Sequence, residues 1–335
     1  MLNVAIVGAS GYTGLELVKI LVNHPKFTLT YIANSSGDTT VDNLHPSLHK
    51  VISMDVEKAD AKNISEVADL CFLALPHKTA MSFAKELLAL GVKVVDLSAD
   101  YRLELDTYEE HYCAHEDKEN LPSSVYGLPE YYVNDIKNAK LIANPGCYPT
   151  ATLLGLLPFV EFINENDNIF VDAKSGVSGA GKKLSDITSF VTVNDNIFAY
   201  NPFKHRHMPE IKEKVKLLKN KEFTINFVPH LIPATRGMLV SIYCTLNKKI
   251  DASAILEECY KDSEFIRIRK TPVDIKSTAG TNFCDIFVAQ NENALFINTS
   301  IDNLLRGASS QAVVNANIMS GYDAGLGINK ISYVP

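Results

Sequence analysis

One cysteine of the chain stands in a setting that would activate it as a nucleophile. Cys147 follows the turn sequence Asn144-Pro145-Gly146, and an apolar pattern of helical period occupies residues 151–157 directly after it. A thiol at the start of a helix has a lowered pKa, because the helix dipole and the free backbone amides stabilise the thiolate. Most cysteines are instead buried structural thiols. The turn before Cys147 and the helical pattern after it favour a reactive thiolate at this position.

A histidine pair supplies the acid or base that a thiolate nucleophile needs. His205 and His207 lie two residues apart, so on an extended segment both side chains point to the same side, and Glu210 follows at the start of a predicted helix. The same pattern is compatible with a zinc site, but no third or fourth ligand has a suitable spacing. Surface or packing histidines are a further alternative. We predict an acid–base role for the pair and no bound metal.

Two glycine-rich segments have the composition of phosphate-binding loops. Gly8, Gly11 and Gly14 follow a predicted strand and precede a predicted helix. In that context a glycine loop places its backbone amides against a pyrophosphate. The second segment, residues 173–182, leaves another predicted strand and contains three glycines and two lysines. It suits a phosphate or the nicotinamide end of a cofactor. Either loop by itself is also compatible with an ordinary turn.

The turn after the second predicted strand bears on the choice of cofactor. An NAD enzyme usually has Asp or Glu there to bind the ribose 2′-hydroxyl. This chain has Asn34, Ser35 and Ser36, whose amide and hydroxyl groups can donate to a 2′-phosphate that a carboxylate would repel. We therefore predict NADP, with Ser35 and Ser36 among its ligands. No Lys or Arg lies in this turn, and an unliganded polar turn is the alternative.

Alternating strands and helices in the first part of the chain would position these segments. Short apolar runs alternate with helical patterns, which predicts a Rossmann-type doubly wound parallel sheet. Residues 101–132 break this rhythm and predict loops and a short helix. The predicted strands are residues 3–7, 27–33, 70–74, 92–96 and 141–143, and the predicted helices are residues 14–23 and 80–90.

The second half of the chain has longer strands without the strand–helix–strand rhythm. It predicts an α+β domain with a largely antiparallel sheet. An amphipathic helical pattern at residues 311–320 predicts a helix that packs back on the first domain. The predicted domains are residues 1–146, completed by the C-terminal helix 309–335, and residues 147–308. The strands predicted in the second domain are residues 168–174, 223–229, 237–246 and 294–301, and its helices are residues 211–218 and 252–260.

Composition and charge narrow the class of protein. The chain has 335 residues, a formal net charge of −7 and no basic run, which gives no reason to expect nucleic acid or an anionic membrane as a partner. No apolar stretch has the roughly 18 residues that a membrane span needs. The six scattered cysteines and the absence of a secretory signal predict a reduced, cytoplasmic protein.

Taken together, these segments resemble the N-acetyl-gamma-glutamyl-phosphate reductase family of the arginine pathway, over essentially the whole chain. The cysteine motif at residues 144–150 and the His-Arg-His-Met-Pro-Glu segment at residues 205–210 are its most specific matches. The other matching segments are residues 8–14, 96–102, 126–130, 174–181, 229–233, 235–237 and 302–308. The resemblance implies a fold similar to glyceraldehyde-3-phosphate dehydrogenase and to aspartate-semialdehyde dehydrogenase.

The resemblance also implies a reaction. NADPH would reduce an acyl phosphate to N-acetylglutamate semialdehyde with release of phosphate, through a thioester on Cys147, while His205 supplies and removes protons. A homo-oligomer, dimer or tetramer, is implied as well. The implied substrate ligands are Arg102, Asn144, His207, Glu210 and Arg236, and the implied cofactor ligands are Gly8, Ser10, Gly11, Tyr12, Thr13, Gly14, Ser35, Ser36, Ser178, Gly179 and Asn303. Family members often carry Arg in the turn after the second strand, which is absent here.

Three other functions compete with this one. The chain could act on an aspartyl phosphate or on a carrier-linked aminoadipyl phosphate, although the Asn-Pro-Gly-Cys-Tyr form of the motif argues against the aspartyl substrate. A cysteine hydrolase would use Cys147 and His205 but would have no need of a nucleotide loop. A non-catalytic NADP sensor would need neither Cys147 nor the histidine segment.

Overall fold

The computed structural model describes residues 1–333 and divides the chain into two compact units. Unit 1 contains residues 1–146 and 308–328, and unit 2 contains residues 147–307 and 329–335. The predicted extension of the first domain therefore ends at residue 328; residues 329–333 belong to unit 2, and residues 334–335 lie outside the described residues. Side-chain hydrogen bonds hold this segment in unit 2. Asn329 donates to the carbonyl oxygen of Gly280, and Ser332 donates to that of Lys276.

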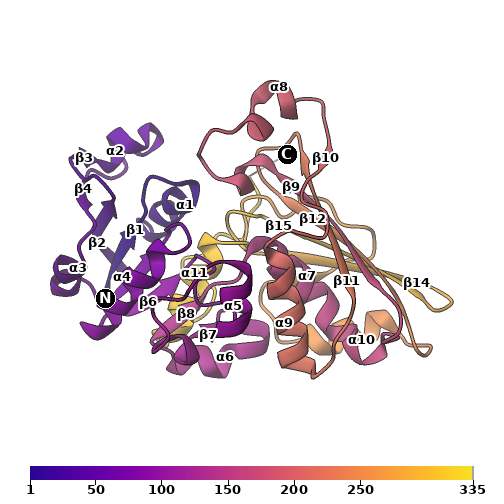
Figure 1. Cartoon of the computed structure of the whole chain (residues 1–335). Coiled ribbons are helices and arrows are strands. Elements are labelled where there is room, and N and C mark those ends of the chain that lie inside the picture. Colours follow the sequence, from indigo (N-terminus) through magenta and orange to yellow (C-terminus); the bar gives the residue numbers. More distant parts are fainter. Residues whose placement is uncertain (334–335) are drawn as a thin grey trace. The chain divides into compact units, whose positions relative to one another are not determined.

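Unit 1 is built on an eight-stranded sheet with the order β3-β4-β2-β1-β5-β6-β8-β7 (Figure 1). Every neighbouring pair is parallel except β3 and β4, so the predicted doubly wound parallel sheet is confirmed. The strands are β1 (Leu2–Val7), β2 (Phe27–Asn34), β3 (Thr39–Thr40), β4 (Asp55–Lys58), β5 (Leu70–Leu73), β6 (Lys93–Asp96), β7 (Val125–Tyr126) and β8 (Leu141–Ala143).

Helices cover both faces of this sheet. Helices α3 and α4 bury one face in a shared apolar cluster, whereas α1 packs with α11 and α11 packs with α6. Gly91, at φ +85°, follows α4 in the left-handed conformation that glycine commonly adopts after a helix. The helices of this unit are α1 (Tyr12–Leu21), α2 (Val41–Leu44), α3 (Ala61–Val67), α4 (Thr79–Ala89), α5 (Leu105–His111), α6 (Pro129–Asn138) and α11 (Ser309–Met319), with short 3-10 turns η1 (Pro46–Leu48) and η2 (Leu121–Ser123).

Helix α11 differs from its prediction in one respect. The sequence predicted an amphipathic helix, but every residue from Ser309 to Met319 is buried. The helix contacts α1, α6 and β6, so no side is left for solvent. Its polar residues point into protein and need internal hydrogen-bond partners.

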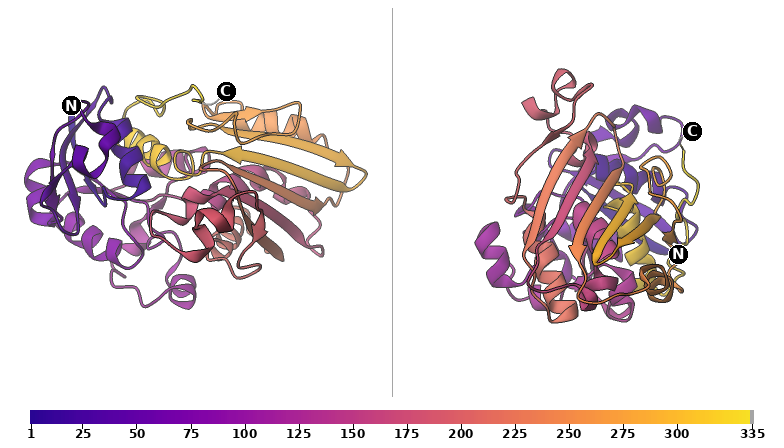
Figure 2. Two further views of the ribbon diagram at one scale, coloured as in Figure 1. Left: turned by 90° about the horizontal axis from the view of Figure 1, so that it is seen from above. Right: turned by 90° about the vertical axis from the view of Figure 1, so that its right-hand side faces the viewer.

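Unit 2 is built on a seven-stranded sheet with the order β10-β11-β9-β12-β15-β14-β13, whose strands lie side by side in the right-hand view of Figure 2. Four neighbouring pairs are antiparallel and two are parallel, which confirms the predicted largely antiparallel sheet. The strands are β9 (Ile169–Gly176), β10 (Phe198–Ala199), β11 (Ile225–Ile232), β12 (Met238–Thr245), β13 (Ile266–Ile268), β14 (Cys284–Asn291) and β15 (Ala294–Ile301).

One face of this sheet carries the core of unit 2. Alternate residues such as Val171, Ile242 and Ile297 are buried beneath the helices, while the residues between them point to the other face. Sequence patterning missed β14, and the structure shows that β14 pairs with β15 as an antiparallel hairpin. The helices are α7 (Cys147–Leu156), α8 (Phe190–Val193), α9 (His207–Lys219) and α10 (Ala252–Tyr260), with 3-10 turns η3 (Leu157–Phe162), η4 (Val177–Ala180) and η5 (Asp186–Thr188).

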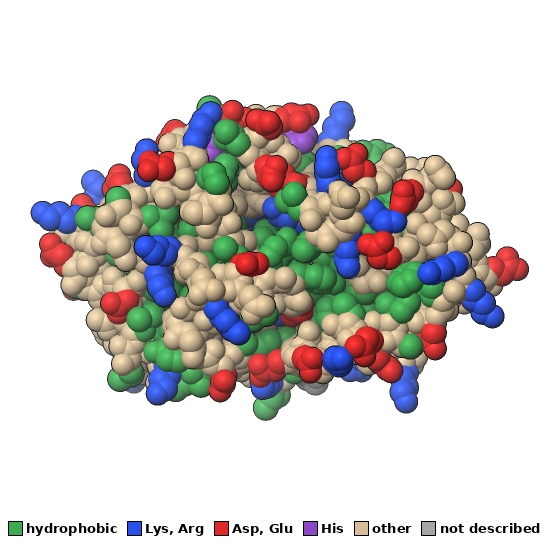
Figure 3. Space-filling view, turned by 90° about the horizontal axis from the view of Figure 1, so that it is seen from below, with side chains coloured by type: hydrophobic (Ala, Val, Ile, Leu, Met, Phe, Trp, Pro, Cys, Tyr) green, Lys and Arg blue, Asp and Glu red, His purple; other side chains and the backbone are tan. Residues whose placement is uncertain are grey.

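The surface carries mixed charges. On the face drawn in Figure 3, lysine and arginine side chains are interspersed with aspartate and glutamate, without a broad area of one sign. Among the described residues, no helix combines the length and the apolar character that crossing a membrane requires.

Candidate active site

Cys147 is the first residue of α7, as the sequence predicted. The rest of the helix is buried, from Tyr148 to Leu156, and no acidic residue lies in its first turn. The Cys147 side chain is partly exposed, whereas Cys71, Cys244 and Cys284 are buried. Burial raises the pKa of the Cys244 thiol to about 12, so that thiol stays protonated. Cys147 is therefore accessible to solvent and lies at the end of a helix that stabilises a thiolate.

Aromatic rings enclose the imidazole of His205. The ring centroid of Tyr148, next to Cys147 in sequence, lies 5.4 Å from that of His205, and those of Tyr200 and Phe227 lie 5.6 and 5.5 Å away. His207 is closer still, at 4.9 Å. The structure thus brings the predicted histidine pair together with the residue that follows Cys147.

The surroundings of His205 disfavour its charged form. Burial, followed by the positive charge of Arg206, lowers the pKa of His205 to about 4. The backbone N–H of His207 also donates a hydrogen bond to Nδ1 of His205 at 3.2 Å. Nδ1 accepts this bond only when it carries no proton, so the neutral ring has its proton on Nε2. His205 is therefore a neutral hydrogen-bond donor at physiological pH.

Two tyrosines at this site were not among the predicted site residues. The hydroxyl groups of Tyr148 and Tyr200 lie 3.1 Å apart, and both phenols interact electrostatically with Cys147. Burial raises the pKa of both and that of Tyr200 to about 12, so both stay protonated. Tyr148 lies within the cysteine motif. No local sequence pattern marks Tyr200 as a site residue, because only the pairing of β10 with β11 brings it to this site.

The second glycine-rich segment forms η4 beside Asn303. Nδ2 of Asn303 donates to the Ser178 hydroxyl at 3.0 Å, and Oδ1 of Asn303 accepts from the backbone N–H of Gly237 at 2.7 Å. A Cβ added to Gly307 would lie 2.6 Å from both the Asn303 carbonyl oxygen and the Cβ of Cys147. The predicted nicotinamide-side residues of unit 2 therefore adjoin Cys147.

Predicted substrate residues of unit 2 occupy two places. Glu210 is buried in the first turn of α9, three residues after His207. Nη1 of Arg236 lies 3.3 Å from a carboxylate oxygen of the buried Asp302, and its guanidinium also stacks over Tyr333 at 5.7 Å. Among the described residues, no group of three or more His, Cys, Asp or Glu side chains has a geometry that could hold a metal ion.

In unit 1 the predicted glycine loop joins β1 to α1. Gly8 has φ +98°, and a Cβ there would lie 2.2 Å from the Ala74 carbonyl oxygen, so only glycine fits. Gly11 caps α1 without a side-chain hydrogen bond, and no acidic residue lies in the first turn. The helix end therefore presents its first amides to an anion. Ser10, Tyr12 and Thr13 lie in this same loop and first turn.

Asn34 organises the turn that follows β2. Its Oδ1 accepts hydrogen bonds from the backbone N–H groups of Ser36 and Gly37, at 2.9 and 2.7 Å, and from the Ser36 hydroxyl at 3.2 Å. Its Nδ2 donates to the hydroxyl of Ser10 in the glycine loop at 3.2 Å. Asn34 was not among the predicted ligands, although its position at the end of the second strand could have indicated a role in this turn.

The other two predicted substrate residues are buried in unit 1. Arg102 donates from Nε to the carbonyl oxygen of Asn144 and from Nη2 to that of Leu97, both at 2.7 Å. The Asn144 side chain donates to the carbonyl oxygen of Ala308 and accepts from Nδ2 of Asn315, both at 3.1 Å. Both residues therefore have extensive contacts within the protein.

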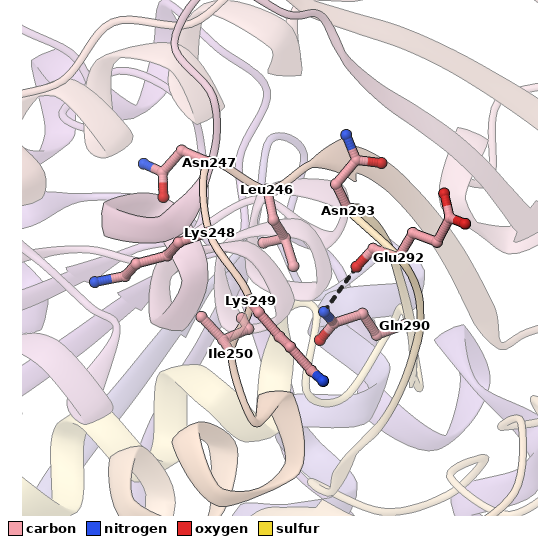
Figure 4. Close-up of a pocket in the computed structure, with 8 residues that line it drawn as sticks. All are labelled: Leu246, Asn247, Lys248, Lys249, Ile250, Gln290, Glu292 and Asn293. Atoms are coloured by element: carbon pink, nitrogen blue, oxygen red, sulfur yellow. Dashed lines mark hydrogen bonds between the residues drawn. The ribbon is translucent and has the colours of Figure 1, made fainter.

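A cavity in unit 2 lies apart from these residues. It is lined by the loop after β12 and the turn between β14 and β15, and Figure 4 shows Lys248, Lys249 and Glu292 around it. Met238, at the start of β12, pairs with Ser175 near η4, whereas the cavity begins one residue after the other end of this strand. An eight-residue strand spans about 25 Å, so the cavity is remote from Ser178.

Known proteins match the chain in both units. The model of the semialdehyde dehydrogenase NAD binding domain matches residues 3–139, and that of the semialdehyde dehydrogenase dimerisation domain matches residues 147–303. An N-acetyl-gamma-glutamyl-phosphate reductase from Sulfurovum sp. (strain NBC37-1) is 64% identical over 335 residues, which is 100% of both chains. One from Sulfurimonas denitrificans is 57% identical over 100% of this chain and 99% of its own.

Solved structures share the fold at low identity. Aspartate semialdehyde dehydrogenase II of Vibrio cholerae, complexed with ASA, superimposes with a TM-score of 0.73 at 17% identity, covering 96% of this chain and 98% of that one. The Candida albicans enzyme with NADP gives a TM-score of 0.71 at 14% identity, with the same coverage. The fold, the motifs and the full-length similarity agree: the chain belongs to the semialdehyde dehydrogenases and, within them, to the N-acetyl-gamma-glutamyl-phosphate reductase family.

Proposed function

We propose that this chain reduces N-acetyl-gamma-glutamyl phosphate to N-acetylglutamate semialdehyde, using NADPH and releasing phosphate. The observation that carries this proposal is identity of 64% along the entire length to a reductase of that name, with Cys147 at the start of a buried helix. We place the reaction in the cytoplasm, where a nucleophilic thiol stays reduced.

The reverse reaction tests the substrate directly. Purified protein is supplied with NADP, phosphate and either N-acetylglutamate semialdehyde or aspartate semialdehyde, and NADPH formation is followed spectrophotometrically. We expect turnover with the acetylglutamate compound to exceed that with the aspartate compound by a factor of about 100 or more, because a site built to bind the acetylamino chain leaves polar groups unpaired with the shorter substrate. Equal rates, or turnover that needs no phosphate, would contradict the proposal.

The thiolate of Cys147 carries the acyl group. Its attack on the acyl carbon forms a sulfur–carbon bond and breaks the carbon–oxygen bond to phosphate, which leaves and takes up one proton from solvent. Bound NADPH would supply the hydride that converts the resulting thioester to the aldehyde. The carbonyl oxygen becomes negative in both steps, and collapse of the second oxyanion returns the Cys147 thiolate without a proton transfer.

His205 suits the role of oxyanion stabiliser. Its neutral ring carries the proton on Nε2, because Nδ1 accepts the hydrogen bond from the His207 backbone. A donor held in place by Tyr148, Tyr200 and Phe227 needs no reorganisation when negative charge develops on the substrate oxygen. We therefore propose that His205 donates a hydrogen bond in both steps, in place of the proton transfer predicted from the sequence.

A lysine from a neighbouring strand supports NADP as the cofactor. Lys58, on β4, is the register partner of Asn34 on β2, and its side chain is exposed. Paired residues of neighbouring strands project to the same face of a sheet, and the Asn34 side chain on that face reaches Ser10 of the glycine loop. The turn itself has no cation for a 2′-phosphate, and Lys58 therefore supplies one. Arg102, Arg236 and Glu210 remain our proposed substrate ligands.

Removal of the Lys58 charge is expected to weaken NADPH specifically. In Lys58→Ala the KM for NADPH should rise about tenfold, while the KM for NADH should stay within twofold, because only NADPH has the phosphate that a charge-assisted hydrogen bond recognises. Lys261→Ala, at an exposed lysine of α10's C-terminus in unit 2, is the matched control and should change neither value. Equal losses for NADPH and NADH would exclude this role for Lys58.

Self-association is proposed for the sheet face of unit 2 that is turned away from the core. Phe170, Tyr243 and Phe296 form a row across β9, β12 and β15, in which Phe170 pairs with Tyr243 and Tyr243 pairs with Phe296. Phe170 and Tyr243 are 51% and 48% exposed, which is unusual for two adjacent aromatic residues. This face lies within the matched dimerisation domain. A second copy of the chain is the partner that such a face would bind.

A charge placed in the aromatic row should disrupt the oligomer. We expect Tyr243→Asp to weaken association by about 30-fold or more, since a central interface aromatic commonly contributes roughly 2 kcal/mol. Sedimentation velocity across a concentration series measures the change. Leu90→Asp, a 48% exposed leucine at the end of α4, should leave association unchanged. An oligomer that persists unchanged in Tyr243→Asp would rule out this face.

A further inference from the structure

The chain passes from one unit to the other at three places, after Gly146, after Gly307 and after Ile328. Within unit 1, Nδ2 of Asn144 donates a hydrogen bond to the Ala308 carbonyl oxygen at 3.1 Å. Within unit 2, a Cβ on Gly307 would lie 2.6 Å from the Cβ of Cys147. The first two crossing segments therefore contact each other within unit 1 through Asn144 and Ala308, and within unit 2 through Cys147 and Gly307.

Asn144 is the anchor of the first crossing segment, three residues before Cys147. Its backbone N–H donates to the Asp96 carbonyl oxygen at 2.8 Å, and its own carbonyl oxygen accepts from Nε of Arg102 at 2.7 Å. Its side-chain Oδ1 accepts from Nδ2 of Asn315 at 3.1 Å. Together with the bond to Ala308, all four polar groups of this buried residue have partners.

Asn315 lies on α11, far from Asn144 in sequence, and it is fully buried. Its Nδ2 also donates to the Gly127 carbonyl oxygen at 2.9 Å, and Gln311, one helical turn earlier, donates to the same oxygen at 2.8 Å. A Cβ on Gly127 would lie 2.3 Å from Nδ2 of Asn315, so glycine is needed for this contact. The backbone N–H of Gly127 in turn donates to Ala143.

These amides are an unexpected choice for a buried helix. Oε1 of Gln311 and Oδ1 of Asn315 have no hydrogen-bond partner within the described part of the chain. A leucine at position 315 would remove one unsatisfied acceptor but would leave Oδ1 of Asn144 without its donor. The presence of Asn315 is explained if its donated hydrogen bonds serve the geometry of Asn144 and Gly127.

We propose that Asn315 of α11 is a positioning residue for Cys147. It fixes the side chain of Asn144, whose other groups hold Ala308 and Arg102, and so sets where the Pro145-Gly146 turn ends and α7 begins. Cys147 then has its place at the helix start, on which the thiolate depends. This inference rests on the proposed role of Cys147 in the reaction.

The test compares two asparagines on the same helix. Asn315→Leu removes the bonds to Asn144 and Gly127. Asn317→Leu is the matched control, because Asn317 is equally buried and its Nδ2 also donates two hydrogen bonds, to the carbonyl oxygens of Ala324 and Leu326. Four quantities are measured for each variant: the melting temperature, kcat, KM, and the rate at which iodoacetamide alkylates Cys147 across a range of pH. The alkylation rate is read from the Cys147 peptide by mass spectrometry.

We expect both variants to lose thermal stability, but only Asn315→Leu to lose catalysis. Its kcat should fall about 10- to 100-fold, as for a reacting group displaced by about 1 Å, with little change in the KM for NADPH. The midpoint of Cys147 alkylation should move to higher pH. In Asn317→Leu, kcat and the alkylation profile should match the wild type. If Asn315→Leu is not obtained folded, Asn315→Ser, too short to reach Oδ1 of Asn144, takes its place.

Two results would overturn the inference. One is an Asn315 variant with wild-type kcat and alkylation profile; the other is an equal loss of kcat in both helix variants, which would indicate a general effect of stability. The proposed function is tested separately, because it fails if Cys147→Ser retains activity, whatever the Asn315 variants do.

Discussion

Cys147→Ser is expected to reduce turnover about 10⁴-fold or more, while the affinity for NADPH stays within a factor of two. Serine keeps the size of the side chain but is not ionised at neutral pH, and an oxygen ester accepts hydride less readily than a thioester. The loss should appear in kcat, since the nucleophile acts in the chemical step. NADPH oxidation measures turnover, and quenching of cofactor fluorescence on titration measures binding.

Another cysteine provides the control for this substitution. Cys259 is the exposed cysteine of α10. Cys259→Ser should retain full activity, and its melting temperature should be no lower than that of the wild type. Iodoacetamide should inactivate the wild type and Cys259→Ser at the same rate. If Cys147→Ser turned over at more than a few per cent of the wild-type rate, a thioester on this residue would be excluded.

Two substitutions of His205 should separate hydrogen-bond donation from proton transfer. His205→Ala removes the Nε2 donor and should lower kcat about 10²- to 10³-fold, the usual effect of losing one oxyanion donor. His205→Gln places an amide N–H near the position of Nε2 and should recover at least tenfold of that loss. Glutamine cannot exchange protons, so equal inactivity of the two variants would show that His205 transfers a proton.

The pH dependence gives a second measurement on the same residue. Burial lowers the pKa of His205 to about 4 from its ordinary 6.5, so the ring stays neutral from about pH 5 upward. The plot of kcat/KM against pH should therefore show no inflection near pH 6.5 that is due to His205. An inflection there in the wild type that His205→Gln lacks would contradict this. Between pH 6.5 and 4 the unfolded chain binds a proton here that the folded chain does not, so this residue's contribution to stability falls as the pH falls.

Local sequence was sufficient wherever a site residue is placed by its immediate neighbours. Gly8, Gly11 and Gly14 form the predicted loop because β1, the turn and α1 follow one another in the chain. The start of α7 at Cys147 was predictable for the same reason. The parallel and antiparallel sheets also follow from spacing and periodicity, since those patterns reflect which faces must be buried.

Residues that act through long-range pairing could not be found in this way. Lys58 comes beside Asn34 only because β4 pairs with β2, and Tyr200 reaches Tyr148 only because β10 pairs with β11. The strand β14 was missed because its residues lack a clear alternation of polar and apolar types. The helix α11 was predicted to be amphipathic, and only its packing on α1 and α6 shows that all its residues are buried.

The sequence by itself determined the chemistry that we propose for this protein: a thiolate nucleophile, a nucleotide loop and a histidine pair, each marked by residues close together in the chain. The tertiary structure decided how those groups are tuned. The backbone of His207 and a ring of aromatic residues set the charge and the proton position of His205. Asn315, 168 positions after Cys147, donates a hydrogen bond to Asn144, three residues before Cys147. Reactive groups depend on residue type, which sequence records, whereas burial and hydrogen-bond partners depend on segments that only folding brings together.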